Sequence, residues 1–181
     1  MPDVTGADGG ARPGTVEVRL LRAADAEAVG PLHNRMWRLT YTGLVPQERL
    51  DALDDAASVG RWRELGRVLE RDGRTSTGAV TRVLTVNGVP VGFAGAGPPR
   101  DDDAPASQEL WSLYLAPEHH GSGLADVLMD ASLPPGPAYL WVLRGNERAA
   151  AYYRKRGFVR DGATKPLAGT DALEDRLVRP D

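Results

Sequence analysis

Apolar and polar residues along the first part of the chain change from a strand pattern to a helix pattern. Alternation with β-branched residues predicts a strand over 15–22. Apolar residues at helical spacing then predict a helix capped by Asp25, a short helix from Pro46 and a third helix over 58–71. The chain therefore begins with one strand followed by a helical segment.

The second part of the chain returns to strand patterns. Asn87-Gly88 separates two apolar runs and is a dipeptide favoured in tight hairpin turns. The run "AYLWVL" is apolar throughout, as expected of a central strand covered on both faces. Strands are predicted over 80–86, 89–97, 109–117 and 138–143, with one or two closing strands between 158 and 179.

Two more helices are predicted among these strands. Helical spacing after "HHGSG" continues until Pro134-Pro135 ends it. Asn146 is placed to cap the next helix, which ends at Gly157. The chain thus mixes helices and strands, and its first four strands favour antiparallel pairing.

Composition limits the classes of function. A length of 181 residues favours one domain, expected over 15–181 after a disordered tail, 1–14, that mixes Gly, Pro, Asp and Ala without periodicity. A net charge of -3 argues against nucleic acid as a partner. No cysteine and three histidines argue against a metal site. No apolar run reaches the length of a membrane span or a signal peptide, so no membrane and a cytoplasmic location are expected.

The stretch "HHGSGLADVLMDA" places a glycine-rich turn at the start of a predicted helix. Such a turn is either a plain helix cap or a cradle of backbone N–H groups that suits phosphate, and the two alternatives are evenly matched on this stretch alone. A nucleotide P-loop is excluded because no lysine lies nearby. The dinucleotide fingerprint also fails, because Asp126 stands where a small residue is required.

The whole second half resembles the GCN5-related N-acetyltransferase (GNAT) family. "LYLAPEHHGSGLADVLMDA" resembles the family's strand followed by a Gln/Arg-x-x-Gly-x-Gly/Ala loop, with matches at Gly123 and Ala125 and a departure at His120. "LWVLRGNERAAAYYRKRGF" matches the family's Asn-x-x-Ala-x-x-x-Tyr-x-x-x-Gly-Phe signature throughout. The resemblance covers about 80–158 and implies an α+β GNAT fold, with a mostly antiparallel sheet of six or seven strands, splayed central strands and flanking helices.

The resemblance also implies acetyl-coenzyme A as co-substrate, with no metal. The implied cofactor contacts come from the strand, the glycine loop and the following helix. They are Leu113, Tyr114, Leu115, His120, Gly121, Ser122, Gly123, Leu124, Ala125, Asn146, Ala149 and Tyr152. Asn146 has the alternative of being only a helix cap.

Two residues are catalytic candidates. The resemblance assigns to Tyr153 the protonation of the departing thiolate, against the alternative of a packing residue. It offers Glu109 as a general base, and strict strand alternation would place Glu109 on one face with Trp111. The alternative is that Glu109 is a solvated carboxylate at the start of a strand.

Aromatic residues are candidates for the acceptor pocket, namely Trp37, Tyr41 and Trp111, although Trp37 also fits a core position. The leading hypothesis is an enzyme that transfers an acetyl group to a primary amine of a small molecule or peptide. The alternative is a non-catalytic acyl-coenzyme A sensor or regulatory module on the same fold. A homodimer is possible, since edge strands of such folds can pair.

Overall fold

The computed structural model describes residues 14–180. The predicted tail, residues 1–14, lies outside the described residues except for Gly14. The helices and strands follow the predicted order closely. They are β1 (Val16–Leu20), α1 (Ala26–Tyr41), α2 (Gln47–Asp51), α3 (Asp55–Asp72), β2 (Val80–Val86), β3 (Val89–Gly97), β4 (Glu109–Leu115), α4 (Leu124–Ser132), β5 (Ala138–Leu143), α5 (Glu147–Lys155), β6 (Val159–Pro166) and β7 (Leu173–Arg179), with 3₁₀ turns at Ala23–Asp25 (η1) and Pro117–His119 (η2).

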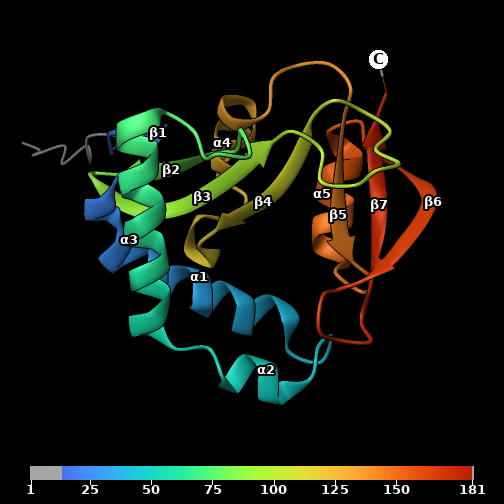
Figure 1. Ribbon diagram of the computed structural model, residues 1–181, viewed down its shortest axis with the longest axis horizontal. Helices are drawn as coiled ribbons and strands as arrows, with labels where there is room; N and C mark the ends of the chain where they lie inside the picture. The colour runs from blue at the N-terminus through green and yellow to red at the C-terminus, as the bar shows by residue number, and fades with distance from the viewer. Residues whose placement is uncertain (1–13, 181) are drawn as a thin grey trace, which may run out of the picture.

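Seven strands form one sheet in the order β1-β2-β3-β4-β5-β7-β6 (Figure 1). Every neighbouring pair is antiparallel except β4 and β5, which run parallel. The expectation of a mostly antiparallel mixed sheet with six or seven strands is therefore confirmed.

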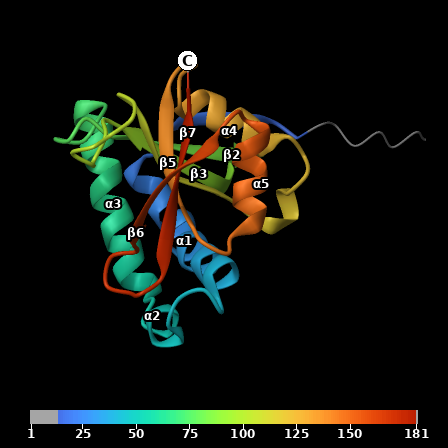
Figure 2. The same cartoon turned by 90° about the vertical axis from the view of Figure 1, so that its right-hand side faces the viewer.

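Helices cover both faces of the sheet (Figure 2), with α1 and α3 on one side and α4 and α5 on the other. The side chains of neighbouring residues in one strand point to opposite faces of the sheet. Val83 packs with residues of α1 and α3, whereas Leu84 packs against α4. This alternation explains why the central strands are apolar on both faces.

Local sequence signals account for several boundaries. Asn87 and Gly88 have φ of 52° and 81°, as a two-residue hairpin turn with both central residues at positive φ requires. Asp54 caps α3 by accepting a 2.6 Å hydrogen bond from the Ala57 N–H. The predicted cap at Asp25 is wrong in its detail, because that carboxylate accepts hydrogen bonds from Arg19 and from the Arg22 N–H instead of capping α1.

The central pair β4–β5 positions the site. These strands pair only at Glu109 with Tyr139 and at Leu110 with Leu140, and then diverge. In β4 the register against β3 also shifts between Leu110 and Ser112, so that Trp111 is the extra residue of a β-bulge. The predicted splay is confirmed, and the backbone of β4 beyond the bulge is left without a strand partner on its β5 side.

Candidate active site

A cavity of about 740 Å³ lies where β4 and β5 diverge. Its walls come from both strands, from α1 and α5, from the glycine turn before α4, and from β6, β7 and the loop that joins them. This size is in the range of pockets that bind small molecules. The long loop between β3 and β4 contributes Arg100 and Asp101 to one end.

The glycine turn forms the opposite end of the cavity. Gly121 and Gly123 have φ of 77° and 82°, and a Cβ on either would meet nothing within 4 Å, so the space in front of them is open. The backbone N–H groups of Gly121, Ser122, Gly123 and Ala125 have no acceptor within residues 14–180. These free donors stand at the N-terminus of α4, where the helix dipole is positive.

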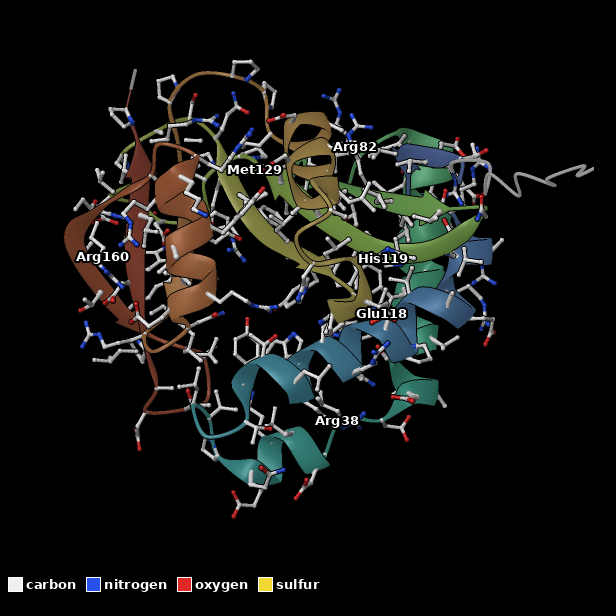
Figure 3. The ribbon with its side chains drawn as sticks, turned by 180° about the vertical axis from the view of Figure 1, so that it is seen from behind. Arg38, Arg82, Glu118, His119, Met129 and Arg160 are labelled. Atoms are coloured by element: carbon white, nitrogen blue, oxygen red, sulfur yellow. The ribbon has the colours of Figure 1, made fainter. Side chains whose placement is uncertain are left out.

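Two predicted contacts of this turn serve the protein itself. Ser122 donates its hydroxyl hydrogen to the His119 carbonyl at 2.6 Å, and it is absent from the cavity wall formed by residues 14–180. Leu124 packs its side chain toward the core around Leu84. Figure 3 shows Glu118 and His119 where the end of β4 approaches α1, and Glu118 accepts two hydrogen bonds from Arg35 of that helix. This ion pair links η2, just before the turn, to α1.

His120 occupies the position at which the sequence departs from the family motif. Its Nδ1 lies 2.5 Å from Nη1 of Arg148, and its Nε2 lies 2.9 Å from the Leu115 carbonyl oxygen. Because a guanidinium only donates, Nδ1 must accept and Nε2 must carry the proton that is donated to Leu115. Arg148, which the sequence analysis missed, thereby brings a positive charge to the glycine turn from α5.

The predicted β4 contacts all line the cavity, but they are not equally free. The Leu115 carbonyl is occupied by His120, while Leu113 faces the divergence from β5. The Tyr114 hydroxyl forms a 2.8 Å hydrogen bond with the hydroxyl of Tyr41 from α1. This bond joins β4 to α1.

On α5, two adjacent tyrosines have different surroundings. Tyr152 donates its hydroxyl to Asp126 of α4 at 3.1 Å, whereas the Tyr153 hydroxyl has no partner within residues 14–180. Tyr153 is 8% exposed and lines the cavity. Burial, with smaller contributions from Tyr41 and Tyr152, raises the pKa of Tyr153 well above that of a free phenol, so that it stays protonated.

Asn146 is a helix cap and also lines the cavity. Its side chain caps α5 by accepting a 3.2 Å hydrogen bond from the Ala149 N–H, and both residues line the cavity. The cap uses only the side-chain oxygen, so the amide NH₂ group remains available to a ligand.

Glu109 has a different environment from the one expected. Its side chain is fully buried, accepts hydrogen bonds from Arg100 and from the Tyr139 hydroxyl, and takes no part in the cavity wall formed by residues 14–180. The alternation argument that placed it with Trp111 does not hold, because the bulge at Trp111 interrupts the alternation. Its role as a base stays a prediction, and its contacts give it a structural role in holding the β3–β4 loop.

The three aromatic residues predicted for the acceptor pocket, Trp37, Tyr41 and Trp111, all line the cavity. The sequence analysis missed Trp141, Lys165 and Glu174, which join the same wall. Trp141 lay in the predicted central strand, but Lys165 and Glu174 reach the cavity only through the pairing of β5, β7 and β6. No local signal marked those two residues.

Between residues 14 and 180, no helix has the length and apolar character needed to cross a bilayer. No group of three or more acidic, histidine or cysteine side chains is arranged there to hold a metal ion.

Known sequences are similar to this chain. A family model described as "Acetyltransferase (GNAT) domain" matches residues 77–160, which contain β2 to β5 with α4 and α5. A "Probable N-acetyltransferase" of Mycobacterium tuberculosis is 27% identical over 168 residues, covering 88% of this chain and 91% of that protein. An "Uncharacterized N-acetyltransferase" of Bacillus subtilis is 24% identical over 143 residues, covering 76% and 77%.

Solved structures share the fold. The PaiA N-acetyltransferase from Thermoplasma acidophilum, crystallised in complex with coenzyme A, superposes with a TM-score of 0.64 at 19% identity, covering 89% of this chain and 98% of that one. At this identity the likeness concerns the fold alone. The match to the GNAT domain model, the related N-acetyltransferase sequences and the shared fold all support a GCN5-related N-acetyltransferase, an acetyltransferase enzyme.

Proposed function

We propose that this protein transfers the acetyl group of acetyl-coenzyme A to a primary amine by direct attack of the amine. The observation that carries the proposal is the unbonded Tyr153 hydroxyl in the cavity between the diverging strands, with a free N–H cradle at one end of that cavity. Acetyl-coenzyme A would supply a thioester, whose carbonyl carbon is open to attack by the nitrogen of an amine.

The chain's residues fit the coenzyme. The N–H groups of Gly121, Ser122, Gly123 and Ala125 at the start of α4 suit the pyrophosphate. Arg148 lies beside them and supplies the cation that the motif position of His120 lacks. The free backbone groups of β4 after its bulge, with the Asn146 side chain opposite, would hold the pantetheine amides.

Tyr153 has the properties of the general acid. Its hydroxyl is unbonded, and its raised pKa keeps it protonated at neutral pH, so a proton is available as negative charge develops on the sulfur. The ring is fixed between Tyr152 and Phe158, with centroids 5.4 Å and 5.9 Å away, so the hydroxyl has little freedom to leave the cavity. Tyr152 cannot serve equally, because its hydroxyl is bonded to Asp126.

Binding is tested by calorimetric titration of coenzyme A and acetyl-coenzyme A into the wild type and into Gly123→Glu. The substitution places a carboxylate in the cradle, where it repels phosphate. Gly162→Glu is the matched control, because Gly162 also has a positive φ (94°) and open space around it, but lies on β6. We expect binding by the wild type and by the control, and none by Gly123→Glu.

Transfer is then tested by thiol release with a panel of primary amines. Thiol release that needs both an amine and an intact cradle would support the proposal. Tight coenzyme binding without transfer to any amine would contradict it and would favour an acyl-coenzyme A sensor. No binding by a folded wild type would remove the coenzyme from the proposal altogether.

A further inference from the structure

We propose that Glu174 of β7 binds the ammonium group of the acceptor and takes its proton, and that the acceptor is a monoamine without a carboxylate beside the amine. This inference rests on the proposed function and names its acceptor class and its base. It starts from the wall formed by β6 and β7, which no motif of the sequence marked.

Cross-strand pairing places Glu174 at the cavity. Glu174 pairs with Leu143 of β5 on one side and with Lys165 of β6 on the other, and directly opposed residues of antiparallel strands share a face. All three residues line the cavity. Tyr41 of α1 lies close enough for the charge of Glu174 to raise the pKa of its phenol, in addition to the larger effect of burial. Glu174 therefore faces the acceptor end.

The charges at this end are paired, except for that of Glu174. Arg100 is bonded to the buried carboxylate of Glu109, with Nε 3.0 Å from Oε1. Lys165 is bonded to Asp101, with Nζ 2.7 Å from Oδ1. Within residues 14–180, the side-chain carboxylate of Glu174 accepts no hydrogen bond and forms no ion pair, since the neighbouring cations Arg100 and Lys165 bind Glu109 and Asp101 instead.

This pairing discriminates between classes of acceptor. A single ammonium group finds one free carboxylate, and a second ammonium group would find none. The carboxylate of an amino acid would find no free cation, because Arg100 and Lys165 are engaged and Arg148 lies at the coenzyme end. Burial of an unpaired charge is unfavourable, so amino acids and diamines should be poor acceptors.

The rest of the wall suits an apolar body. The rings of Trp111 and Trp141 line this end, and each already has a cation over its face: Arg100 at 4.7 Å and Lys165 at 4.1 Å. These faces are therefore not free to bind a further cation by a cation–π contact. Together with Trp37 and Tyr41, these rings give the cavity wall an aromatic character that suits an alkyl or arylalkyl group.

Glu174 also has the acid–base character of a catalytic base. Burial raises the pKa of Glu174 above its ordinary value, as do the charges of Glu109 and Asp101, while Lys165 and Arg100 oppose the rise. A carboxylate with a raised pKa accepts a proton more readily than a solvated one. The carboxylate of Glu109, by contrast, has its hydrogen-bonding capacity taken up by Arg100 and Tyr139.

The proton balance closes with these two residues. Glu174 takes one proton from the ammonium group, and the freed electron pair of the nitrogen forms the bond to the thioester carbonyl carbon. As the carbon–sulfur bond breaks, Tyr153 gives its phenolic proton to the sulfur. Tyr153 regains a proton from the nitrogen as this becomes the amide, and Glu174 releases its proton to solvent, so one proton is released per acetyl group transferred.

The test measures kcat/KM from pH 5 to 9 for wild type, Glu174→Gln and Glu174→Asp. The probes are 2-phenylethylamine, phenylalanine, which adds only a carboxylate, and 1,4-diaminobutane. In the wild type we expect the monoamine to be preferred by about 100-fold over phenylalanine, and the rate to fall at acid pH. We expect kcat/KM to be roughly 100- to 10,000-fold lower in Glu174→Gln, and its decline at acid pH to disappear. Glu174→Asp should recover part of the activity and part of the pH dependence.

Two controls separate this inference from the proposed function. The melting temperature and the calorimetric affinity for coenzyme A should be unchanged in Glu174→Gln, since Glu174 has no bonds to lose and lies away from the cradle. Two results would overturn the inference and leave the proposed function intact, provided that the wild type transfers acetyl groups. One is an acid limb that is unchanged in Glu174→Gln, and the other is that phenylalanine is as good an acceptor as 2-phenylethylamine. Coenzyme binding with no transfer to any amine would overturn both the inference and the proposed function.

Discussion

Replacing Tyr153 by phenylalanine tests the general acid with little change in structure. The substitution removes one hydroxyl that has no partner within residues 14–180 and keeps the ring between Tyr152 and Phe158. The free energy of unfolding should therefore change by less than about 0.5 kcal/mol. Loss of a general acid typically costs roughly 100- to 10,000-fold in rate, or about 3 to 5 kcal/mol of transition-state stabilisation.

Tyr152→Phe is the matched control, since it makes the same chemical change one residue earlier. It removes the 3.1 Å hydrogen bond to Asp126 and should cost about 1 kcal/mol of stability. Transfer should fall little, because that hydroxyl is directed to α4. We therefore expect opposite patterns: Tyr153→Phe loses activity, whereas Tyr152→Phe loses stability.

The assay is single-turnover thiol release at saturating acetyl-coenzyme A, with urea unfolding followed in parallel. Single turnover isolates the chemical step from product release. The raised pKa of Tyr153 adds a second expectation, that the wild-type rate shows no decline attributable to this phenol below about pH 10. Full activity in Tyr153→Phe, or equal losses in both variants, would refute the assignment.

Three further predictions concern charge. Arg100→Ala should lower the free energy of unfolding by about 3 kcal/mol, because it leaves the buried carboxylate of Glu109 without its cation; urea unfolding that shows no loss would contradict this. Arg148→Ala should weaken coenzyme A binding and reduce its dependence on salt, as measured by calorimetry at two ionic strengths, and an unchanged affinity would remove Arg148 from the phosphate site. Burial pushes the pKa of Asp25 upward, yet hydrogen bonds from Arg19 and a backbone N–H bring it below its ordinary value. Its contribution to stability should therefore be present above the unfolded pKa of about 3.9 and be lost as the pH falls through the lower folded value. Asp25→Asn should make acid unfolding curves shallower, whereas a curve identical to wild type would show that this carboxylate adds nothing.

Much of the architecture could be predicted because its signals are local. The dipeptide at Asn87-Gly88 adopts positive φ at both residues, and Gly121 and Gly123 adopt the backbone conformation expected of an open turn. Period and propensity act within a few residues, so element types and order followed directly from the sequence. The spacing around Tyr153 likewise depends on one helix.

Interactions between distant segments could not be predicted in this way. Strict alternation from Glu109 to Trp111 failed because a bulge depends on the partner strand β3 as much as on β4 itself. The resemblance gave the two adjacent tyrosines different roles, but it did not indicate that Asp126 of α4 accepts a hydrogen bond from Tyr152. Each of these features is a contact between segments that no periodicity links.

The sequence by itself determined the helices, the strands and the glycine turn, because backbone preferences and apolar spacing are properties of neighbouring residues. Only the tertiary structure decided which charges stay free. Arg148 reached the glycine turn because α5 packs beside α4, and Glu174 reached the acceptor end because β7 lies between β5 and β6. A charge is paired or unpaired according to what the rest of the chain places within about 4 Å of it, and that is fixed only when the sheet and its helices are assembled.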